Sequence, residues 1–294
     1  MPRVAFLTLE EIADFVIDDA LAITELRQRG WVAEELPWSR ADVDWSQFDL
    51  VIIRTTWDYH DRPAEFLAAL ARIEASGARL ENPLALVEWN LDKQYLRTLE
   101  ARGIAIVPSV WGHGGDAHGF RSLFVTLQDT EIVIKPTISG GAKDTFRLVS
   151  PISDSMLQRL VDTFDDRDWF AQGFLRSVIT EGEYSLFYFG GVLSHAVQKV
   201  PKPGDFRVQE EHGGEIMNVA ITPELRRMAD GVLASITPVP LQARIDLVRL
   251  DNGTLAVMEV ELIEPSLYLR MHPDAPGNFA NALEQLFLPP LHDE

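Results

Sequence analysis

The sequence predicts an α/β fold, in which a small parallel α/β domain precedes two mixed α+β lobes. Its first 80 residues alternate short apolar runs with amphipathic segments, an order typical of a parallel sheet with crossover helices. Further along, two pairs of apolar runs flank turn-forming residues, which predicts antiparallel hairpins. The length of 294 residues allows two domains and a small third lobe.

The N-terminal part begins with the apolar run VAFL at 4–7, which we interpret as a buried strand. A helix is predicted over 18–29, where alanine and leucine recur at helical spacing before a glycine. The run LVII predicts a second strand at 50–53. A second helix is predicted over 63–75, because a proline suits its first turn. These elements define the order strand–helix–strand–helix.

The middle of the chain changes character after the Asn82-Pro83 break. Its apolar spacing and short apolar runs predict a helix at 90–102, strands at 104–107, 131–135, 145–149 and 169–175, and a further helix at 153–164.

The C-terminal part contains the hairpin signals. Residues 183–200 alternate in polarity around Gly190-Gly191, and the runs 243–250 and 254–262 flank Asp251-Asn252-Gly253. Between the hairpins, 201–216 is rich in proline, glycine and charge, which predicts a long mobile loop. The remaining segments predicted to be helical are 223–236 and 276–287.

The composition is that of a globular protein, with 46% apolar and 24% charged residues. Twenty-six basic and 45 acidic residues give a formal charge of −19, which argues against non-specific binding of nucleic acid or anionic lipid. There are no cysteines, so disulfides, thiolate catalysis and cysteine-bound metals are excluded. The N-terminus does not have the pattern of a signal peptide, and no apolar stretch has membrane-spanning length. We expect a cytoplasmic protein without nucleic-acid or membrane partners.

Lys135 stands where an apolar strand leads into a loop with Gly140 and Gly141. A lysine point charge and free backbone N–H groups are what phosphate oxygens need. The pattern is not the Walker motif, since no helix follows. The alternative is an ordinary solvated lysine at a strand end.

Two carboxylates, Glu259 and Glu261, are spaced so that they share one face of an otherwise apolar strand. They would repel each other without a cation, and Asp246 on the partner strand can join them. Oxygen donors without histidine or cysteine suit Mg²⁺. Leu255 and Val257 are predicted on the face of Glu259, which favours its burial. The alternative is the wet face of a hairpin.

Basic residues near these acids supply the positive charge that a triphosphate needs. Arg244 is two residues before Asp246 and shares its strand face, where a guanidinium can stabilise transferring phosphoryl charge or orient a carboxylate. Lys199 ends the first hairpin, and Lys202 and Arg207 lie in the long loop.

Candidate substrate residues follow two strand ends, where α/β folds place ligands. Arg54, Trp57 and Asp58 follow the second strand, and Asp58 is suited to an ammonium group. Tyr268 and Arg270 follow the strand with the paired carboxylates, and Arg270 is suited to a carboxylate. For Trp57 the alternative is packing between lobes.

The ordered set of these motifs resembles the ATP-grasp superfamily of carboxylate–amine ligases, including prokaryotic glutathione synthetase and D-alanine–D-alanine ligase. In detail it looks most like the branch containing O-ureido-D-serine cyclo-ligase of D-cycloserine biosynthesis. The resemblance covers about three-quarters of the chain. The matching segments are 54–59, 82–96, 132–146, 182–214, 243–248 and 258–269.

The resemblance implies site roles that the residue types alone do not give. Lys93 and Lys135 match the two ATP lysines, Glu183 the ribose-binding acid, and Lys199 a basic residue beside the nucleotide. The adenine hinge is matched by Gln172, Phe174 and Leu175. Arg207 and Arg244 match catalytic arginines, and the Mg²⁺ ligands are matched by Asp246, Glu259 and Glu261. Two departures are Glu261, where an Asn is usual, and the short glycine loop that ends in Lys143.

The implied domains are a pre-ATP-grasp domain at 1–85, a central lid lobe at 86–170 and a C-terminal lobe with the Mg²⁺ site at 171–294. The implied activity is ATP-dependent activation of a small amino-acid carboxylate as an acyl-phosphate, attacked by an amine-type nucleophile of the same molecule. Two ions of Mg²⁺ are expected, with Mn²⁺ as a substitute, and a homo-oligomer is a further expectation. The alternatives are an intermolecular peptide or amide ligase and an ATP-binding protein without catalysis.

Overall fold

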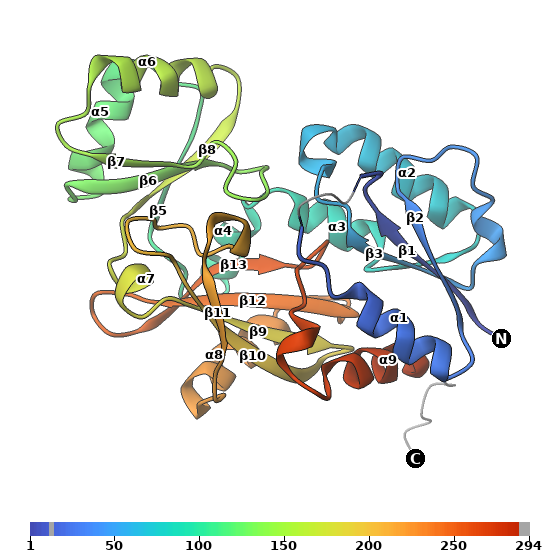
Figure 1. Ribbon diagram of the computed structural model, residues 1–294. Coiled ribbons are helices and arrows are strands. Elements are labelled where there is room, and N and C mark those ends of the chain that lie inside the picture. The colour runs from blue at the N-terminus through green and yellow to red at the C-terminus, as the bar shows by residue number, and fades with distance from the viewer. Residues whose placement is uncertain (12–14, 288–294) are drawn as a thin grey trace.

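A parallel sheet forms from the N-terminal part of the chain in the computed structural model, which describes residues 1–11 and 15–287 (Figure 1). Its strands, in the spatial order β2-β1-β3-β4, are β1 (Arg3–Thr8), β2 (Val32–Pro37), β3 (Leu50–Thr55) and β4 (Arg79–Glu81). Val4 and Phe6 of β1 face one core cluster and Ala5 and Leu7 the other, as the two-residue period of a strand requires. The sheet therefore has an apolar core on both faces.

Helices cover both faces of this sheet. They are α1 (Asp19–Gln28) and α2 (Pro63–Ala75). On the α1 face lies α9 (Ala275–Gln285), which returns from the C-terminal end of the chain (Figure 1). The predicted strands and helices of this region are confirmed. Strands β2 and β4 were not predicted, because VAEELP carries two glutamates and RLE is only three residues long.

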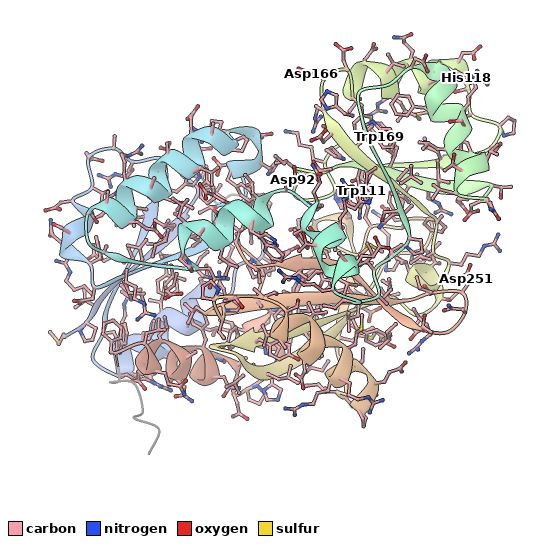
Figure 2. All side chains as sticks on the ribbon, turned by 180° about the vertical axis from the view of Figure 1, so that it is seen from behind. Asp92, Trp111, His118, Asp166, Trp169 and Asp251 are labelled. Carbon is pink, nitrogen blue, oxygen red and sulfur yellow. The ribbon has the colours of Figure 1, made fainter. Side chains whose placement is uncertain are left out.

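The predicted helix at 90–102 is wrong as a single element. The chain forms α3 (Leu84–Leu91) and α4 (Tyr95–Ala101), with a break between them at Asp92 (Figure 2). Asp92 has extended backbone angles, and the amide of Lys93 donates to the carbonyl of Thr137, 2.9 Å away, instead of to the preceding turn. A tertiary hydrogen bond therefore replaces the helical one and presents Lys93 to the neighbouring sheet.

A second sheet is antiparallel, with the order β5-β8-β6-β7. Its elements are β5 (Ser109–His113), α5 (Ala117–Thr126), β6 (Glu131–Pro136), β7 (Phe146–Val149), α6 (Asp154–Thr163) and β8 (Asp168–Gly173). Helices α5 and α6 cover one face and close a core cluster made only of residues 120–171. Trp111 and Trp169 lie within this part of the molecule (Figure 2). The predicted strand at 104–107 is instead a single bridge between Ile106 and Val257.

The third sheet is antiparallel, with the order β11-β10-β9-β12-β13. Its elements are α7 (Ser177–Thr180), β9 (Glu183–Phe189), β10 (Val192–Val200), β11 (Glu215–Asn218), α8 (Pro223–Ala234), β12 (Gln242–Arg249) and β13 (Leu255–Glu261). Both predicted hairpins and the helix beginning at residue 223 are confirmed. The predicted loop at 201–216 contains a short turn of helix at Glu210–His212 and ends in β11, which pairs with β10.

A β-bulge at Met258 changes the faces of β13. Asp246 pairs with Glu259 but the next residue, Leu247, pairs with Val257, so Met258 is an extra residue. Leu255 and Val257 consequently lie in the core beneath the sheet, on the face opposite to Glu259. The prediction that these apolar residues share the face of Glu259 is wrong, because strict alternation does not survive a bulge.

Candidate active site

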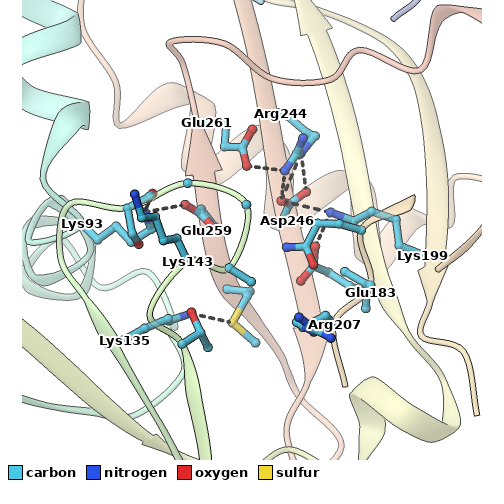
Figure 3. A pocket seen from close by; sticks show the side chains of 18 of the residues that line it. Lys93, Lys135, Lys143, Glu183, Lys199, Arg207, Arg244, Asp246, Glu259 and Glu261 are labelled. Carbon is cyan, nitrogen blue, oxygen red and sulfur yellow. Dashed lines mark hydrogen bonds and ion pairs between the residues drawn. The ribbon is translucent and has the colours of Figure 1, made fainter. Parts of the chain in front are cut away.

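A cleft of about 500 Å³ lies between the second and third sheets, with additional lining from the loop after β3. Figure 3 shows charged side chains from both sides pointing into it. The cleft is lined by these predicted residues: Trp57, Lys93, Lys135, Gly140, Gly141, Gln172, Phe174, Leu175, Glu183, Lys199, Arg207, Arg244, Asp246, Glu259, Glu261 and Tyr268. The fold thus gathers residues that are up to 211 positions apart in the chain, from Trp57 to Tyr268. Their individual roles remain predictions.

One end of the cleft is basic. Lys135 ends β6, where the strand period turns it and Val133 away from the core formed by Ile132 and Ile134. Its ammonium lies 4.9 Å from the centre of the Phe170 ring. Removal from water lowers the pKa of Lys135. Among residues 1–11 and 15–287 this ammonium forms no ion pair, which leaves it available to a phosphate oxygen.

The glycine-rich loop at this end is held from two sides. The Lys143 ammonium pairs with Asp61, and the His212 ring lies 3.3 Å from the Gly141 carbonyl. A side chain at Gly140 would meet the His60 ring at 3.1 Å, so glycine permits close approach of the loop to the first domain. The loop is therefore packed over the cleft.

An apolar slot lies beside Lys135, whose ammonium is 3.8 Å from the Met258 sulfur. Phe174 and Leu175 line it together with residues that the sequence analysis did not single out. These are Val107, Val178, Val208 and Met258, which belong to one small apolar cluster. Nothing in their spacing distinguishes them from core residues, so sequence alone had no signal for them. A flat aromatic ring is the ligand that fits apolar walls beside a strand edge.

A chain of opposite charges crosses the floor of the cleft (Figure 3). Strand register places Glu183 opposite Lys199, and the lysine pairs with both Glu183 and Asp246, the latter at 3.3 Å. Arg244 lies 2.9 Å from Asp246 and also pairs with Glu261. These buried charges are thus arranged in alternation.

The charge chain sets the protonation of its members. Burial opposes the charged form of Asp246, but Arg244 and Lys199 outweigh it and lower the pKa of this carboxyl to about 2. Burial, with the neighbouring carboxylates of Glu259 and Asp246, raises the pKa of Glu261 to about 7 despite Arg244. Burial likewise raises the pKa of Glu183. At Glu261 and Glu183, therefore, burial and neighbouring acids outweigh the attraction of the nearby cations.

The carboxylates fit Mg²⁺ in part. Glu259 pairs with Lys93 at 3.2 Å, and Lys93 with Lys135 holds the pKa of Glu259 below its usual value against the effect of burial. Glu261 is incompletely neutralised, and carboxylate oxygens are the donors that Mg²⁺ takes alongside substrate phosphates. Asp246 is engaged by Arg244, Lys199 and the Ser185 hydroxyl. Within residues 1–11 and 15–287, no three His, Cys, Asp or Glu residues are grouped as a metal site.

Three predicted substrate residues do not line this cleft. Arg54 is buried and donates to Asp19 at 3.0 Å, to Gln242 at 2.7 Å and to the Pro265 carbonyl. Arg54 therefore lies at the junction between the first and third sheets. It pairs there with Asp19 of the same chain and not with a ligand.

The other two are also engaged elsewhere. Asp58 accepts from the Trp38 indole at 2.7 Å and from Arg62 at 2.8 Å. Arg270 pairs with Asp18 at 2.9 Å and with Glu210 at 2.5 Å. Both residues form ion pairs outside the cleft. Their positions in the sequence do not reveal these partners.

Two acidic residues of the cleft, Glu264 and the exposed Glu211, were missed by the sequence analysis. Glu264 lines the cleft, with the Tyr59 hydroxyl as a hydrogen-bonding neighbour. Burial and the nearby Glu261 raise the pKa of Glu264 to about 8. Trp57 donates its indole N–H to the Glu264 carbonyl at 2.9 Å and so holds this segment against the first domain. The sequence feature that could have indicated Glu264 is an acid directly before a proline, three residues after Glu261, the second of the paired carboxylates.

The fold and the cleft together define a nucleotide-dependent ligase of the ATP-grasp type. Residues 120–267 match the prokaryotic glutathione synthetase ATP-grasp domain, and residues 4–82 match the N-terminal domain of D-cycloserine synthetase DcsG. The chain belongs to the ATP-grasp ligase family, in the group that carries this N-terminal domain. It is an ATP-dependent ligase, and ATP and Mg²⁺ are the cofactors of its fold.

Individual relatives agree with this placement. The chain is 34% identical over 286 residues to the cycloserine biosynthesis protein DcsG of Streptomyces lavendulae, covering 90% of this chain and 91% of that protein. It is 26% identical over 222 residues to a probable α-L-glutamate ligase 2 of Hahella chejuensis, covering 73% of this chain and 67% of that protein.

Solved structures give the same result. The crystal structure of D-cycloserine synthetase DcsG superposes with a TM-score of 0.86 and 30% identity, covering 97% of this chain and 99% of that one. The ATP-grasp ligase PsnB with a precursor variant, Mg and ADP shares the fold, with a TM-score of 0.67 and 13% identity over 96% and 98% of the two chains. In the described part of the chain, no helix combines the length and apolarity that a membrane span requires.

Proposed function

We propose that this protein closes the ring of D-cycloserine from O-ureido-D-serine, with one molecule supplying both the carboxylate and the attacking nitrogen. The observation that carries the proposal is the combined match: an N-terminal domain of the D-cycloserine synthetase type, and 34% identity to DcsG across 90% of this chain. The ATP-grasp domain alone is shared with ligases of other substrates.

The nucleotide is proposed to lie along the cleft with its base in the apolar slot and its phosphates at the basic end. All of the residues assigned to it line the cleft: Gln172, Phe174 and Leu175 for the base, Glu183 for the ribose, and Lys93, Lys135 and the loop at Gly140-Gly141 for the phosphates. Bound Mg²⁺ would neutralise phosphate charge during transfer, and Glu259 and Glu261 are the residues suited to hold it. Two ions and replacement by Mn²⁺ remain part of this proposal, as does the role of Asp246 as a ligand.

The chemistry requires positioning and charge stabilisation more than a protein nucleophile. The substrate carboxylate attacks the γ-phosphorus of ATP, the bond to the β-phosphate oxygen breaks, and ADP leaves. Arg244 is placed to stabilise the charge of the acyl-phosphate, while Lys199 and Arg207 line the same cleft. The packed glycine loop excludes water that would hydrolyse the intermediate.

Ring closure follows when the ureido nitrogen attached to oxygen attacks the acyl carbon and phosphate departs. Cycloserine lacks the carbamoyl group of this substrate. One water must therefore remove that group as carbon dioxide and ammonia, so each turnover yields ADP, phosphate, cycloserine, carbon dioxide and ammonia. Release of ammonia together with ADP is a distinguishing readout for this substrate.

The experiment is ADP release from Mg-ATP against a panel of free amino acids, O-ureido-D-serine and dipeptide precursors, with product mass recorded. ADP release with O-ureido-D-serine alone, with the mass of cycloserine and one ammonia per ADP, supports the proposal. ADP release only with an acid–amine pair, giving a condensed product, overturns it in favour of an intermolecular ligase. ADP release with none of these substrates also overturns it. A homo-oligomeric state and a cytoplasmic location remain proposals of the same kind.

A further inference from the structure

In the described part of the chain, Glu264 differs from the other buried or half-buried acids of the cleft in forming no ion pair. Within the described residues, four other buried or half-buried cleft acids are ion-paired: Glu183, Asp246, Glu259 and Glu261. The cleft acid Glu211 is exposed to solvent. Glu264 is half-buried, and its side chain forms no ion pair in the part of the chain that the structure describes.

A carboxylate in this environment is unfavourable unless a bound proton or a cation neutralises it. Removing a carboxylate from water costs free energy that an opposite charge normally offsets. The Tyr59 hydroxyl is a neighbour that can donate a hydrogen bond but carries no charge. The raised pKa of Glu264 reflects the same lack of a neutralising charge. A small cation that enters the cleft would supply that charge.

The surroundings of Glu264 favour an organic cation over a second metal. The same cleft is lined by the aromatic residues Trp57, Tyr59 and Tyr268, and aromatic rings attract ammonium groups. Within the described residues, Glu264 is not grouped with two further potential ligands as a metal site. Its main chain accepts a hydrogen bond from the Trp57 indole, and the Tyr59 hydroxyl is a neighbour of its carboxylate.

The position also matches the geometry of an α-amino acid. In such a molecule the ammonium group is one carbon away from the carboxylate. The residue that receives the ammonium must therefore lie close to the place where the carboxylate is activated. Glu264 follows Glu261 by three residues, and the two carboxylates are near enough to influence each other electrostatically.

We propose that Glu264 binds the α-ammonium group of the amino-acid substrate, with Tyr59 as the residue that positions its carboxylate. This assignment rests on the proposed function only in requiring a substrate that carries an ammonium group. It replaces Asp58, which sequence position favoured for that role but whose oxygens are engaged by Trp38 and Arg62 outside the cleft.

The test compares ligands that differ only in the amine. Calorimetry measures the binding of O-ureido-D-serine, D-serine and the desamino analogue 3-(ureidooxy)propanoic acid to the full-length protein, with Mg²⁺ and a non-hydrolysable ATP analogue present. The variants are Glu264→Gln, Tyr59→Phe and Asp58→Asn. Glu65→Gln, an exposed acid on α2 with 67% side-chain exposure, is the matched control for loss of one negative charge.

We expect Glu264→Gln to weaken binding of the amino ligands at least tenfold and to leave the desamino analogue unchanged. Tyr59→Phe should show a smaller loss for the amino ligands alone, since it removes only the orienting hydroxyl. Unchanged binding of the desamino analogue shows that each variant is folded. Asp58→Asn and Glu65→Gln should bind every ligand as the parent protein does.

Other results overturn the assignment. They are equal loss for amino and desamino ligands, unchanged binding of amino ligands by Glu264→Gln, selective loss in Asp58→Asn, or a parent protein that binds no amino ligand. Failure of the proposed function is separately visible. If the parent protein binds the amino acids in a Glu264-dependent manner but does not convert O-ureido-D-serine, the cycloserine proposal fails and the ammonium assignment stands.

Discussion

Replacing Glu264 by glutamine should stabilise the ligand-free protein at alkaline pH. Burial raises the pKa of this carboxyl from its ordinary 4.5 to about 8. The folded state therefore holds a proton that the unfolded chain releases near pH 4.5, and stability falls as the pH rises between these values. Glutamine keeps the shape and accepts a hydrogen bond from Tyr59 without the charge.

The size of the effect follows from the pKa values. At 1.36 kcal/mol per pH unit, the difference between 4.5 and about 8 sets an upper bound of roughly 5 kcal/mol above pH 8. Glu264 is half-buried, so solvent screening reduces this to roughly 2–3 kcal/mol. For a chain of this size that free energy corresponds to an increase of about 5 °C in Tm.

The assay is thermal unfolding of the parent and Glu264→Gln proteins between pH 4 and 8.5, without nucleotide. The difference in Tm should be small at pH 4, where both states are protonated, and should reach its full value above pH 8. A Tm difference that is constant with pH, or a less stable variant at pH 8.5, would refute the reasoning.

Three further variants test the cleft and its surroundings. Lys135→Ala should weaken binding of ATP at least tenfold, measured by calorimetry, because a charge-assisted contact to phosphate is lost; unchanged affinity would remove Lys135 from the site. Glu259→Gln should abolish Mg²⁺-dependent ADP release while the circular dichroism spectrum is kept, and normal turnover would contradict the metal assignment. Arg54→Met should cost about 3–5 kcal/mol of unfolding free energy in denaturant titrations, since it leaves the buried Asp19 without its partner. Adding Asp19→Asn should recover part of that loss, and an Arg54→Met protein as stable as the parent would restore Arg54 as a free substrate residue.

Much of the fold was predictable where local pattern and tertiary environment agree. The hairpin of β12 and β13 has alternating polarity and an Asp-Asn-Gly turn, and the structure confirms it. Helix α2 was predicted with its observed bounds because a proline begins it and its apolar residues recur at helical spacing. These elements depend on their own sequence.

The missed features depend on contacts far along the chain. The segment LALVEWNL, which forms α3, is too uniformly apolar to show a helical period. The break before Lys93 is created by a hydrogen bond to Thr137. The bulge at Met258 has neither glycine nor proline to mark it, and it reverses the faces expected for Val257 and Leu255. The proposed domain boundaries at residues 85 and 170 remain predictions.

The residues of the candidate site divide in the same way, into those that sequence motifs predict and those whose environment depends on distant contacts. Residues predicted from ordered motifs, such as Lys135 and Glu259, line the cleft. Residues predicted only because they follow a strand, such as Arg54 and Asp58, are engaged elsewhere. A residue that follows a strand can be assigned to one end of the sheet from the sequence alone. The residues that form ion pairs with it come from distant segments, and the order of the sequence does not identify them.

The distribution of apolar cores has a consequence for how a nucleotide reaches the cleft. The first and third sheets share one cluster, in which Phe6 and Phe187 belong to the same core as Phe279 of α9. Buried polar contacts such as Asn82 to the Leu262 carbonyl join the same two sheets, so separating them would break both kinds of interaction. The second sheet closes its own core within residues 120–171. Rotating this sheet away from the third to admit a nucleotide would break the contacts of the glycine loop with Asp61 and His212, the hydrogen bond from Lys93 to Thr137 and the packing of Phe170 in the core of the third sheet.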